Sequence, residues 1–360
     1  VFAKVDGEHF TAFIVERGFD GVTSGPEEHK MGLFGSSTTP VILQDVKVPA
    51  ANLLGEIGRG HKVAFNVLNY GRFKLGASAV GNCKSALGES ARYASERQQF
   101  GQPICNFGAI KHKLGEMVAR TYAIESMVFR TAGLLDAMLS NNESTDDNAM
   151  LTALEEYAIE SSIVKVTGSE YLHYVLDENV QIHGGNGFVK DYPAERHYRD
   201  SRVNRIFEGT NEINRLLIPG MLVRRGLQGH FPLVAAAKKL QDEILSPPQI
   251  SSPDSSPLEK QYAAVTMFKK VSLATLGLAM QNYGEKLTDQ QEVLSFVSDI
   301  LMDTYASESV VIRAQRAAAT TTATSKLHED TASLFVNDAA NRVDVAAKAT
   351  LAAMTEGDTL

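Results

Sequence analysis

Apolar residues recur at helical spacing through the middle of the chain, and this pattern limits the fold more than any other feature. Between positions 110 and 135 they return every three or four residues. The stripe consists of Ile110, Leu114, Met117, Thr121, Ile124, Val128, Ala132 and Leu135. This spacing puts all of them on one face of a long α-helix. Such a face must be buried, so the pattern predicts packing against further helices.

A second long helix is predicted from about residue 148 to residue 181, after the polar segment 141–147. Its small residues would let a neighbouring helix approach closely; they are Ala158, Ser161, Ser162 and Gly168. Helical patterning begins near residue 56 and continues beyond these two helices. The sequence therefore predicts an antiparallel four-helix bundle over residues 56–225.

Residues 1–55 are typical of β-structure. Short β-rich runs at 1–5, 10–15 and 40–49 are separated by glycine, proline and aspartate turns. The chain begins at Val1 within an expected strand. We therefore expect residues 1–55 to be the partial remainder of a β-domain whose earlier strands lie upstream.

The sequence changes character again after the bundle. Residues 226–257 are predicted to be a linker region, because prolines and serines accumulate from position 246 onward. Ser256-Pro257-Leu258-Glu259 combines a capping box with proline at the first helical position, which marks a helix start. Residues 258–360 then form an appended helical domain. The fold class expected is mainly α with a partial β domain.

Composition excludes several classes of protein. The net charge of −8 argues against nucleic-acid binding, which needs a basic surface. Cys83 and Cys105 are the two cysteines and form no CxxC pair, so neither a disulfide framework nor a metal site is expected. No apolar run reaches the roughly 20 residues of a membrane span, and no signal peptide is visible. We expect no transmembrane segment.

The segment Arg205–Ile213 carries the first candidate for chemistry. Glu208 follows two apolar residues, Ile206 and Phe207, and precedes Gly209. Loss of solvation beside these residues would raise the pKa of the carboxyl and suit it to act as a base near neutral pH. Gly209 would let a ligand approach the backbone closely. The alternative is that Glu208 merely favours a helix N-terminus.

Two further segments suit binding of a polar ligand. In the first, residues 97–104, Arg97 stands near Gly101, and a guanidinium binds phosphate oxygens with two parallel hydrogen bonds. The alternative is that Arg97 ends a helix. In the second, residues 181–188, glycines would let backbone amides reach a ligand.

A fourth segment, Asn69–Phe73, lies inside the first predicted helix of the bundle. Gly71 costs that helix about 1 kcal/mol, which close packing or a ligand would explain. Arg72 on an apolar helix needs an anionic partner. Glu208 is one candidate for that partner, and an ordinary ion pair at the surface is the other interpretation.

These four segments, in this order, resemble the acyl-CoA dehydrogenase family. Val46–Pro49 and Asn52–Gly55 contribute to the likeness, which covers about residues 1–225. The long C-terminal extension and the phrase Phe10–Arg17 are most similar to the very-long-chain branch. The family has a helical N-terminal domain, a β middle domain and a C-terminal four-helix bundle. The resemblance implies that this chain is N-terminally truncated and begins inside the middle domain.

The resemblance also implies FAD as the cofactor. Five residues would contact the FAD of a partner subunit: Arg97, Phe100, Gln181, Gly184 and Gly185. Thr210 and Glu212 would border the flavin. The residues expected at the substrate are Asn69, Arg72, Phe207 and Gly209.

The activity implied is α,β-dehydrogenation of fatty acyl-CoA thioesters in fatty acid β-oxidation. Glu208 matches the base that removes the α-proton, while the β-carbon passes hydride to flavin N5 and trans-2-enoyl-CoA forms. Some members carry the base just before the arginine that matches Arg72. Here that position is Gly71, which cannot act as a base.

The resemblance also carries expectations about partners and location, and other functions stay open. The resemblance implies a homodimer or a dimer of dimers, electron-transfer flavoprotein as the acceptor, and a bacterial cytoplasm or the mitochondrial matrix or inner-membrane face. Peripheral membrane contact through Leu273, Leu276, Leu278 and Met280 is weighed against packing of these residues in a helical interface. Two other functions stay open, a non-enzymatic helical assembly factor and an acyl-CoA oxidase.

Overall fold

The computed structural model describes residues 1–141, 149–244, 254–320 and 323–355. The described chain is mainly helical with a small β portion at its N-terminal end, as the sequence predicts. Most of the predicted polar break at 141–147 and of the Pro/Ser-rich segment after 246 lies outside the described residues.

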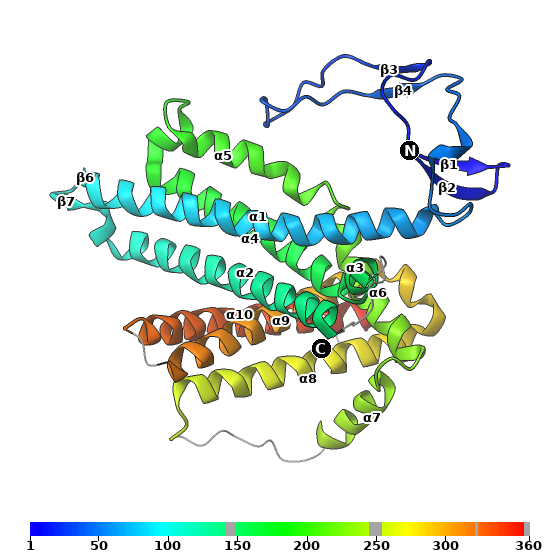
Figure 1. Ribbon diagram of the computed structural model, residues 1–360. Helices are drawn as coiled ribbons and strands as arrows, with labels where there is room; N and C mark the ends of the chain where they lie inside the picture. The colour runs from blue at the N-terminus through cyan, green and yellow to red at the C-terminus, as the bar shows by residue number, and fades with distance from the viewer. Residues whose placement is uncertain (142–148, 245–253, 321–322, 356–360) are drawn as a thin grey trace.

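Three long helices form the centre of the molecule. They are α1 (Gly60–Glu96), α2 (Gly108–Asn141) and α4 (Ala158–His183), and each packs against the other two (Figure 1). The apolar stripe predicted on α2 is confirmed, since Met117, Ile124 and Leu135 are buried. Close packing through small residues is also confirmed. A Cβ added at Gly168 would lie 3.1 Å from the Cα of Gly76 on α1.

The helix predicted from about 148 to 181 is two helices, because α3 (Ala149–Glu156) ends before α4 begins. Arg225 donates hydrogen bonds to the carbonyl oxygens of Glu155 and Glu156, at 2.7 and 2.8 Å. These carbonyls at the end of α3 are therefore satisfied from outside the helix. The residue that satisfies these carbonyls is distant in the sequence, so local periodicity does not reveal the interruption.

Shorter helices connect the bundle to the extension. These are α5 (Pro193–Ser201), α6 (Asn211–Leu227) and α7 (Leu233–Ile244), with α7 inside the predicted linker region. The short 3-10 helices are η1 (Ala50–Asn52), η2 (Ile104–Asn106), η3 (Gly184–Phe188), η4 (Arg202–Arg205) and η5 (Gly284–Asp289).

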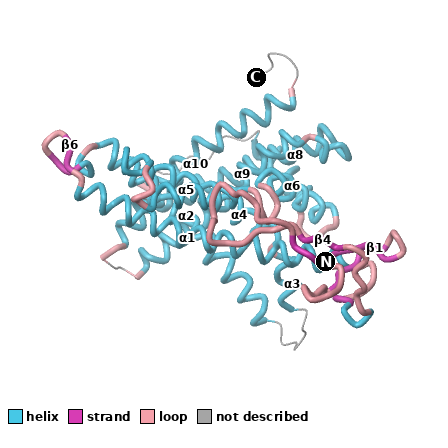
Figure 2. The backbone as a smooth tube through the Cα atoms, turned by 90° about the horizontal axis from the view of Figure 1, so that it is seen from above, coloured by secondary structure: helices cyan, strands magenta, loops and turns pink. Residues whose placement is uncertain are grey.

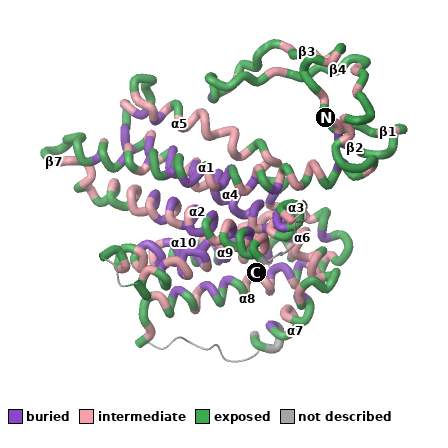
Figure 3. The backbone as a smooth tube through the Cα atoms, viewed as in Figure 1, coloured by how far each residue is buried: buried purple, intermediate pink, exposed green. Residues whose placement is uncertain are grey.

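The extension consists of α8 (Pro257–Tyr283), α9 (Gln291–Ala319) and α10 (Ser325–Met354). Its predicted start is confirmed, since the Ser256 hydroxyl accepts a hydrogen bond from the Glu259 amide and the Glu259 carboxylate accepts one from the Ser256 amide. α9 and α10 pack on α2, and α9 also packs on α6. One hydrophobic core continues from α1 to α10 (Figure 3). The limits of separate domains remain a prediction.

The β portion lies beside the N-terminal end of α1 (Figures 1 and 2). β1 (Phe2–Val5), β2 (His9–Phe13) and β5 (Leu53–Leu54) form one antiparallel sheet. β3 (Val22–Ser24) pairs with β4 (Val41–Leu43), which is much shorter than the run expected at 40–49. β6 (Gln98–Gln99) and β7 (Gln102–Pro103) form a small hairpin between α1 and α2.

By length and composition alone, one stretch of the described residues, Pro257–Asp289, could cross a membrane. It comprises α8 and η5. Val265, Phe268 and Leu276 on α8 are buried inside the protein. Core helices of globular proteins pass the same test, so this helix carries little weight against the expectation of no transmembrane segment.

Candidate functional site

Glu208 lies on a tight loop between η4 and α6. Its φ is +58°, and that of Gly209 is +78°. A left-handed backbone at a non-glycine residue is uncommon and persists only where its surroundings hold it. Thr210 is the N-cap of α6, and its hydroxyl accepts a hydrogen bond from the Ile213 amide at 3.3 Å. Glu208 therefore precedes the helix, and the interpretation of Glu208 as a mere helix-start residue is wrong.

Glu212 occupies the first helical turn instead. Hydrogen bonds from its own backbone amide and from Thr210 lower the pKa of its carboxyl. An ionised carboxylate at this position also interacts favourably with the helix dipole. Thr210 and Glu212, both expected beside the flavin, thus lie next to Glu208 at the start of α6.

The carboxyl group of Glu208 lies directly against Gly71 of α1. A Cβ at position 71 would come within 2.4 Å of the Glu208 Cδ and Oε2. No side chain larger than hydrogen fits there without moving the carboxyl. This contact explains the glycine inside a long helix.

Arg72 is buried, with 3% of its surface exposed, so it is not a surface ion-pair residue. Its Nε donates to the backbone carbonyl of Glu208 at 3.1 Å, and its Nη1 donates to Asn69 Oδ1 at 3.4 Å. Burial lowers the pKa of this guanidinium, and the charge of Glu208 opposes that effect. Asn69, Arg72, Glu208 and Gly209, predicted as one site, are therefore brought together.

Two further residues hold the loop and were missed in the sequence. Lys165 Nζ donates to the Gly209 carbonyl at 2.8 Å and to Asn211 Oδ1 at 2.7 Å. Asn214 Nδ2 donates to the carbonyls of Gly209 at 2.8 Å and Thr210 at 3.0 Å. The signal available for Lys165 is a lone cation in the apolar run Ile163–Val166. Nothing in the sequence marks Asn214, because its role depends on the loop conformation.

Burial, and after it the nearby charge of Arg72, lower the pKa of Lys165 to about 8. The carboxylates of Glu170, Glu212 and Glu208 act in the opposite direction. The loop is therefore held by a lysine whose proton is unusually easy to remove.

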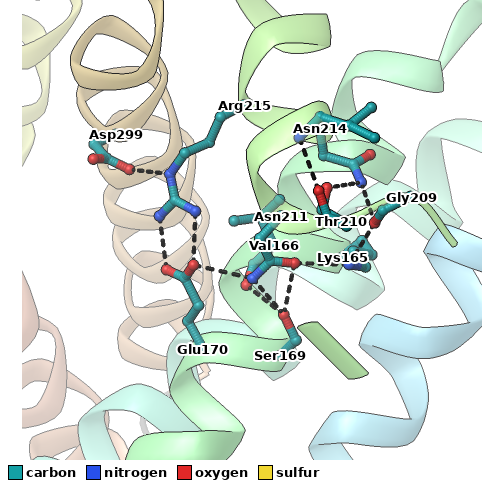
Figure 4. Close-up of polar contacts among 11 residues, drawn as sticks. Lys165, Val166, Ser169, Glu170, Gly209, Thr210, Asn211, Asn214, Arg215 and Asp299 are labelled. Atoms are coloured by element: carbon teal, nitrogen blue, oxygen red, sulfur yellow. Dashed lines mark hydrogen bonds and ion pairs between the residues drawn. The ribbon is translucent and has the colours of Figure 1, made fainter. Parts of the chain in front are cut away.

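Polar contacts continue from Asn211 away from the loop (Figure 4). Asn211 Nδ2 donates to Ser169 Oγ and to Glu170 Oε1, both at 3.0 Å. Glu170 accepts two parallel hydrogen bonds from Arg215, at 2.7 and 2.8 Å. Arg215 Nε donates to Asp299 Oδ1 at 2.8 Å. Asp299 belongs to α9, so the network reaches the extension.

The apolar cover expected around Glu208 differs from the prediction. Ile206 and Phe207 are 54% and 43% exposed. Their sequence position beside Glu208 places them on the loop, but both remain open to solvent. Within the described residues, the enclosing contacts come from Gly71 and Arg72 instead.

The remaining predicted cofactor residues gather at the opposite end of α1. Arg97 is the C-cap residue of that helix, so it does end a helix, as the alternative interpretation predicted. Its side chain is exposed. Phe100 is 91% exposed, with φ +52°, at the turn between β6 and β7. Gln181 is exposed in the last turn of α4, and Gly184 and Gly185 follow in η3.

Aromatic contacts fasten these segments to each other. Asn186 of η3 donates to the Tyr93 hydroxyl at 3.0 Å, and Tyr93 stacks on His183 at 4.2 Å between ring centroids. At 1.5 Å per residue, the helical path from Gly71 to Arg97 is roughly 39 Å. The structure thus brings the predicted residues together in two groups, one at each end of α1.

A cavity of about 530 Å³ lies between α4, α6, α9 and α10. Glu170, Arg215 and Asp299 line it, together with Asp303 and Arg342. Glu208 does not contribute to its wall. This cavity adjoins the polar network rather than the carboxyl group of the candidate base.

Two family models match this chain. A model described as the C-terminal domain of acyl-CoA dehydrogenase matches residues 58–220, and another with the same description matches residues 267–360. Together they cover most of the helices described above. The chain belongs to the acyl-CoA dehydrogenase family, as the sequence motifs predict.

Individual relatives match at high identity. A probable acyl-CoA dehydrogenase of Bacillus subtilis (strain 168) is 47% identical over 366 residues, which cover 100% of this chain and 61% of that protein. The mitochondrial very long-chain specific acyl-CoA dehydrogenase of Homo sapiens is 44% identical over 211 residues, covering 59% of this chain and 30% of that protein.

Among solved structures, an acyl-CoA dehydrogenase complexed with FAD from Bacillus anthracis superimposes with a TM-score of 0.94 and 49% identity. The match covers 99% of this chain and 61% of that one. The chain therefore spans less than two thirds of the length of the bacterial relatives that match it throughout.

Proposed function

We propose that the protein to which this chain belongs is an FAD-dependent dehydrogenase of fatty acyl-CoA thioesters, with Glu208 as the catalytic base. The observation that carries the proposal is the fixed position of the Glu208 carboxyl against Gly71. A base must be held within reach of the proton that it removes. Family membership supplies the substrate class and the reaction.

The loop is suited to the polarisation of a thioester. Its carbonyl groups are occupied by Arg72, Lys165 and Asn214. Among the described residues, no hydrogen bond uses the amide N–H of Glu208. This amide is available to the substrate carbonyl, and such a donor stabilises the negative charge that develops as the α-proton leaves. Bound FAD would accept the hydride from the β-carbon.

The second group of residues supports FAD binding. Arg97 supplies a guanidinium for the pyrophosphate, Gly184 and Gly185 supply backbone amides without side-chain obstruction, and Phe100 supplies an exposed aromatic ring. This group lies roughly 39 Å along α1 from Gly71. One dinucleotide cannot contact both groups within one chain, so we propose a homodimer or a dimer of dimers with shared sites.

Glu208→Gln in the full-length protein tests the assignment. The amide is similar in shape to the carboxyl but cannot accept the α-proton. We expect FAD content and acyl-CoA binding to persist and flavin reduction by acyl-CoA to be abolished, as measured by stopped-flow bleaching. Near-normal bleaching would rule out Glu208 as the base.

Partners of the enzyme follow from the same proposal. Electron-transfer flavoprotein is the expected acceptor, and an oxidase would be distinguished by stoichiometric peroxide production. Membrane contact remains a prediction. Leu276 cannot take part in such a contact, because it is buried. Leu273, Leu278 and Met280 line a groove between α7 and α8. Co-sedimentation with liposomes tests whether that surface binds lipid.

A further inference from the structure

We propose that the C-terminal extension positions the catalytic loop through Asp299, so that helix α9 acts as a support for Glu208. The proposal rests on the function assigned to Glu208 above. Asp299 is a positioning residue in this scheme, because it acts through Arg215 and does not itself touch the loop.

The connection is an unbroken series of short polar contacts (Figure 4). Asp299 accepts from Arg215 at 2.8 Å, and Arg215 binds both carboxylate oxygens of Glu170. Glu170 accepts from Asn211 at 3.0 Å. Asn211 in turn accepts from Lys165, which also donates to the carbonyl of Gly209. Three helices, α9, α6 and α4, are thereby tied to Gly209, the residue after the base.

The geometry of Arg215 explains why Asp299 matters. A guanidinium is planar, so fixing Nε also fixes the directions of both Nη groups. With Nε bound to Asp299, both Nη groups of Arg215 face Glu170 and form a bidentate ion pair with its carboxylate. Without the aspartate charge, Arg215 is free to turn, and Glu170 holds Asn211 less firmly. A loop with left-handed φ at Glu208 depends on such restraint.

The contact that defines this support is specific to one part of α9. Glu308, farther along the same helix, forms a separate ion pair with Arg130 of α2 at 2.8 Å and another with Lys269 of α8. It therefore also joins the extension to the bundle, but it has no path to the loop among these contacts. Glu308→Gln is the matched control for Asp299→Asn.

The test compares hydrogen exchange in the full-length holoenzyme without substrate. In Asp299→Asn we expect amides of the loop and first turn, residues 206–213, to exchange about tenfold faster, because the hydrogen bond from Arg215 then goes to a neutral amide oxygen and is weaker than one to a carboxylate. In Glu308→Gln the same amides should exchange as in the wild type. Asp299→Glu, which keeps the charge, should restore most of the protection.

Flavin reduction supplies the second readout. Asp299→Asn should slow reduction by acyl-CoA about tenfold while FAD content and KM change little, because only the placement of the base is altered. Unchanged loop exchange, equal acceleration in both variants, or faster exchange with normal flavin reduction would each overturn the proposal. Loop exchange is read without turnover, so a failure of Glu208 as the base would be seen separately in Glu208→Gln.

Discussion

Gly71 and Glu208 form a pair in which the absence of a side chain on one residue sets the position of the other. We expect Gly71→Ala to push the Glu208 carboxyl aside, since the new Cβ would lie 2.4 Å from it. The obstructing atoms are the end of a flexible side chain, so the displacement costs little stability, and alanine favours the helix by about 1 kcal/mol. Flavin reduction should fall by about 100-fold, because misplacement of a reacting group by about 1 Å has effects of that size.

Stopped-flow reduction and thermal unfolding together check this expectation. Gly81→Ala on the same helix is the control, because nothing lies within 4 Å of a Cβ at that position. It should raise thermal stability slightly and leave the reaction unchanged. An equally fast reaction in Gly71→Ala would show that the contact with Glu208 is unimportant.

Lys165 gives the site a pH dependence whose sign is fixed. Burial lowers its pKa to about 8, against 10.5 for an ordinary lysine. Between these values an unfolded chain holds a proton that the folded chain has released, so folding stability rises with pH. Relative to Lys165→Met, the wild-type protein should therefore gain free energy of unfolding from pH 8 to pH 10.5, measured by urea denaturation. Parallel pH curves for the two proteins would contradict the shift.

At the scale of single elements, the start of α8 is the clearest local signal. The capping box of Ser256 and Glu259 satisfies two amides at the helix end. We expect Ser256→Ala to lower the free energy of unfolding by about 1 kcal/mol without changing flavin reduction. Glu259→Gln should retain most of the stability, because glutamine also completes a capping box. Chemical denaturation measures both, and equal losses in the two variants would argue against the capping role.

The elements that could be predicted are those whose causes are local. The apolar spacing on α2 and the cap of α8 involve neighbours in sequence, and both are confirmed. The break at Tyr157 could not be predicted, since it involves carbonyls that Arg225 satisfies from far along the chain. The same reason applies within the site. Glu208 and Arg72 stand in recognisable motifs, whereas Lys165 acts only on a loop that has already folded.

At the scale of the whole molecule, the proposed function assigns the two groups of predicted cofactor residues at one FAD to two different chains. Subunit mixing tests this directly. One chain carries Arg97→Ala with Phe100→Ala, and the other carries Glu208→Gln. In a mixed dimer with shared sites, one site holds an intact Glu208 from the first chain and intact Arg97 and Phe100 from the second. We expect flavin reduction to reappear in mixed dimers, although either variant alone is inactive.

Sites built within single chains would leave the mixture as inactive as its components. The roughly 39 Å path along α1 makes that outcome physically unfavourable. Size-exclusion chromatography of the mixture confirms that dimers have exchanged subunits before the rate is measured.

The continuous core has a consequence for any attempt to shorten the protein. Met117 and Ile124 of α2 share that core with Val310 and Phe335 of the extension. A protein truncated after α6 would expose part of this apolar core to water, and the exposed surface would favour aggregation and proteolysis. Removal of the final three long helices would therefore also destabilise the bundle helices that share this core with them.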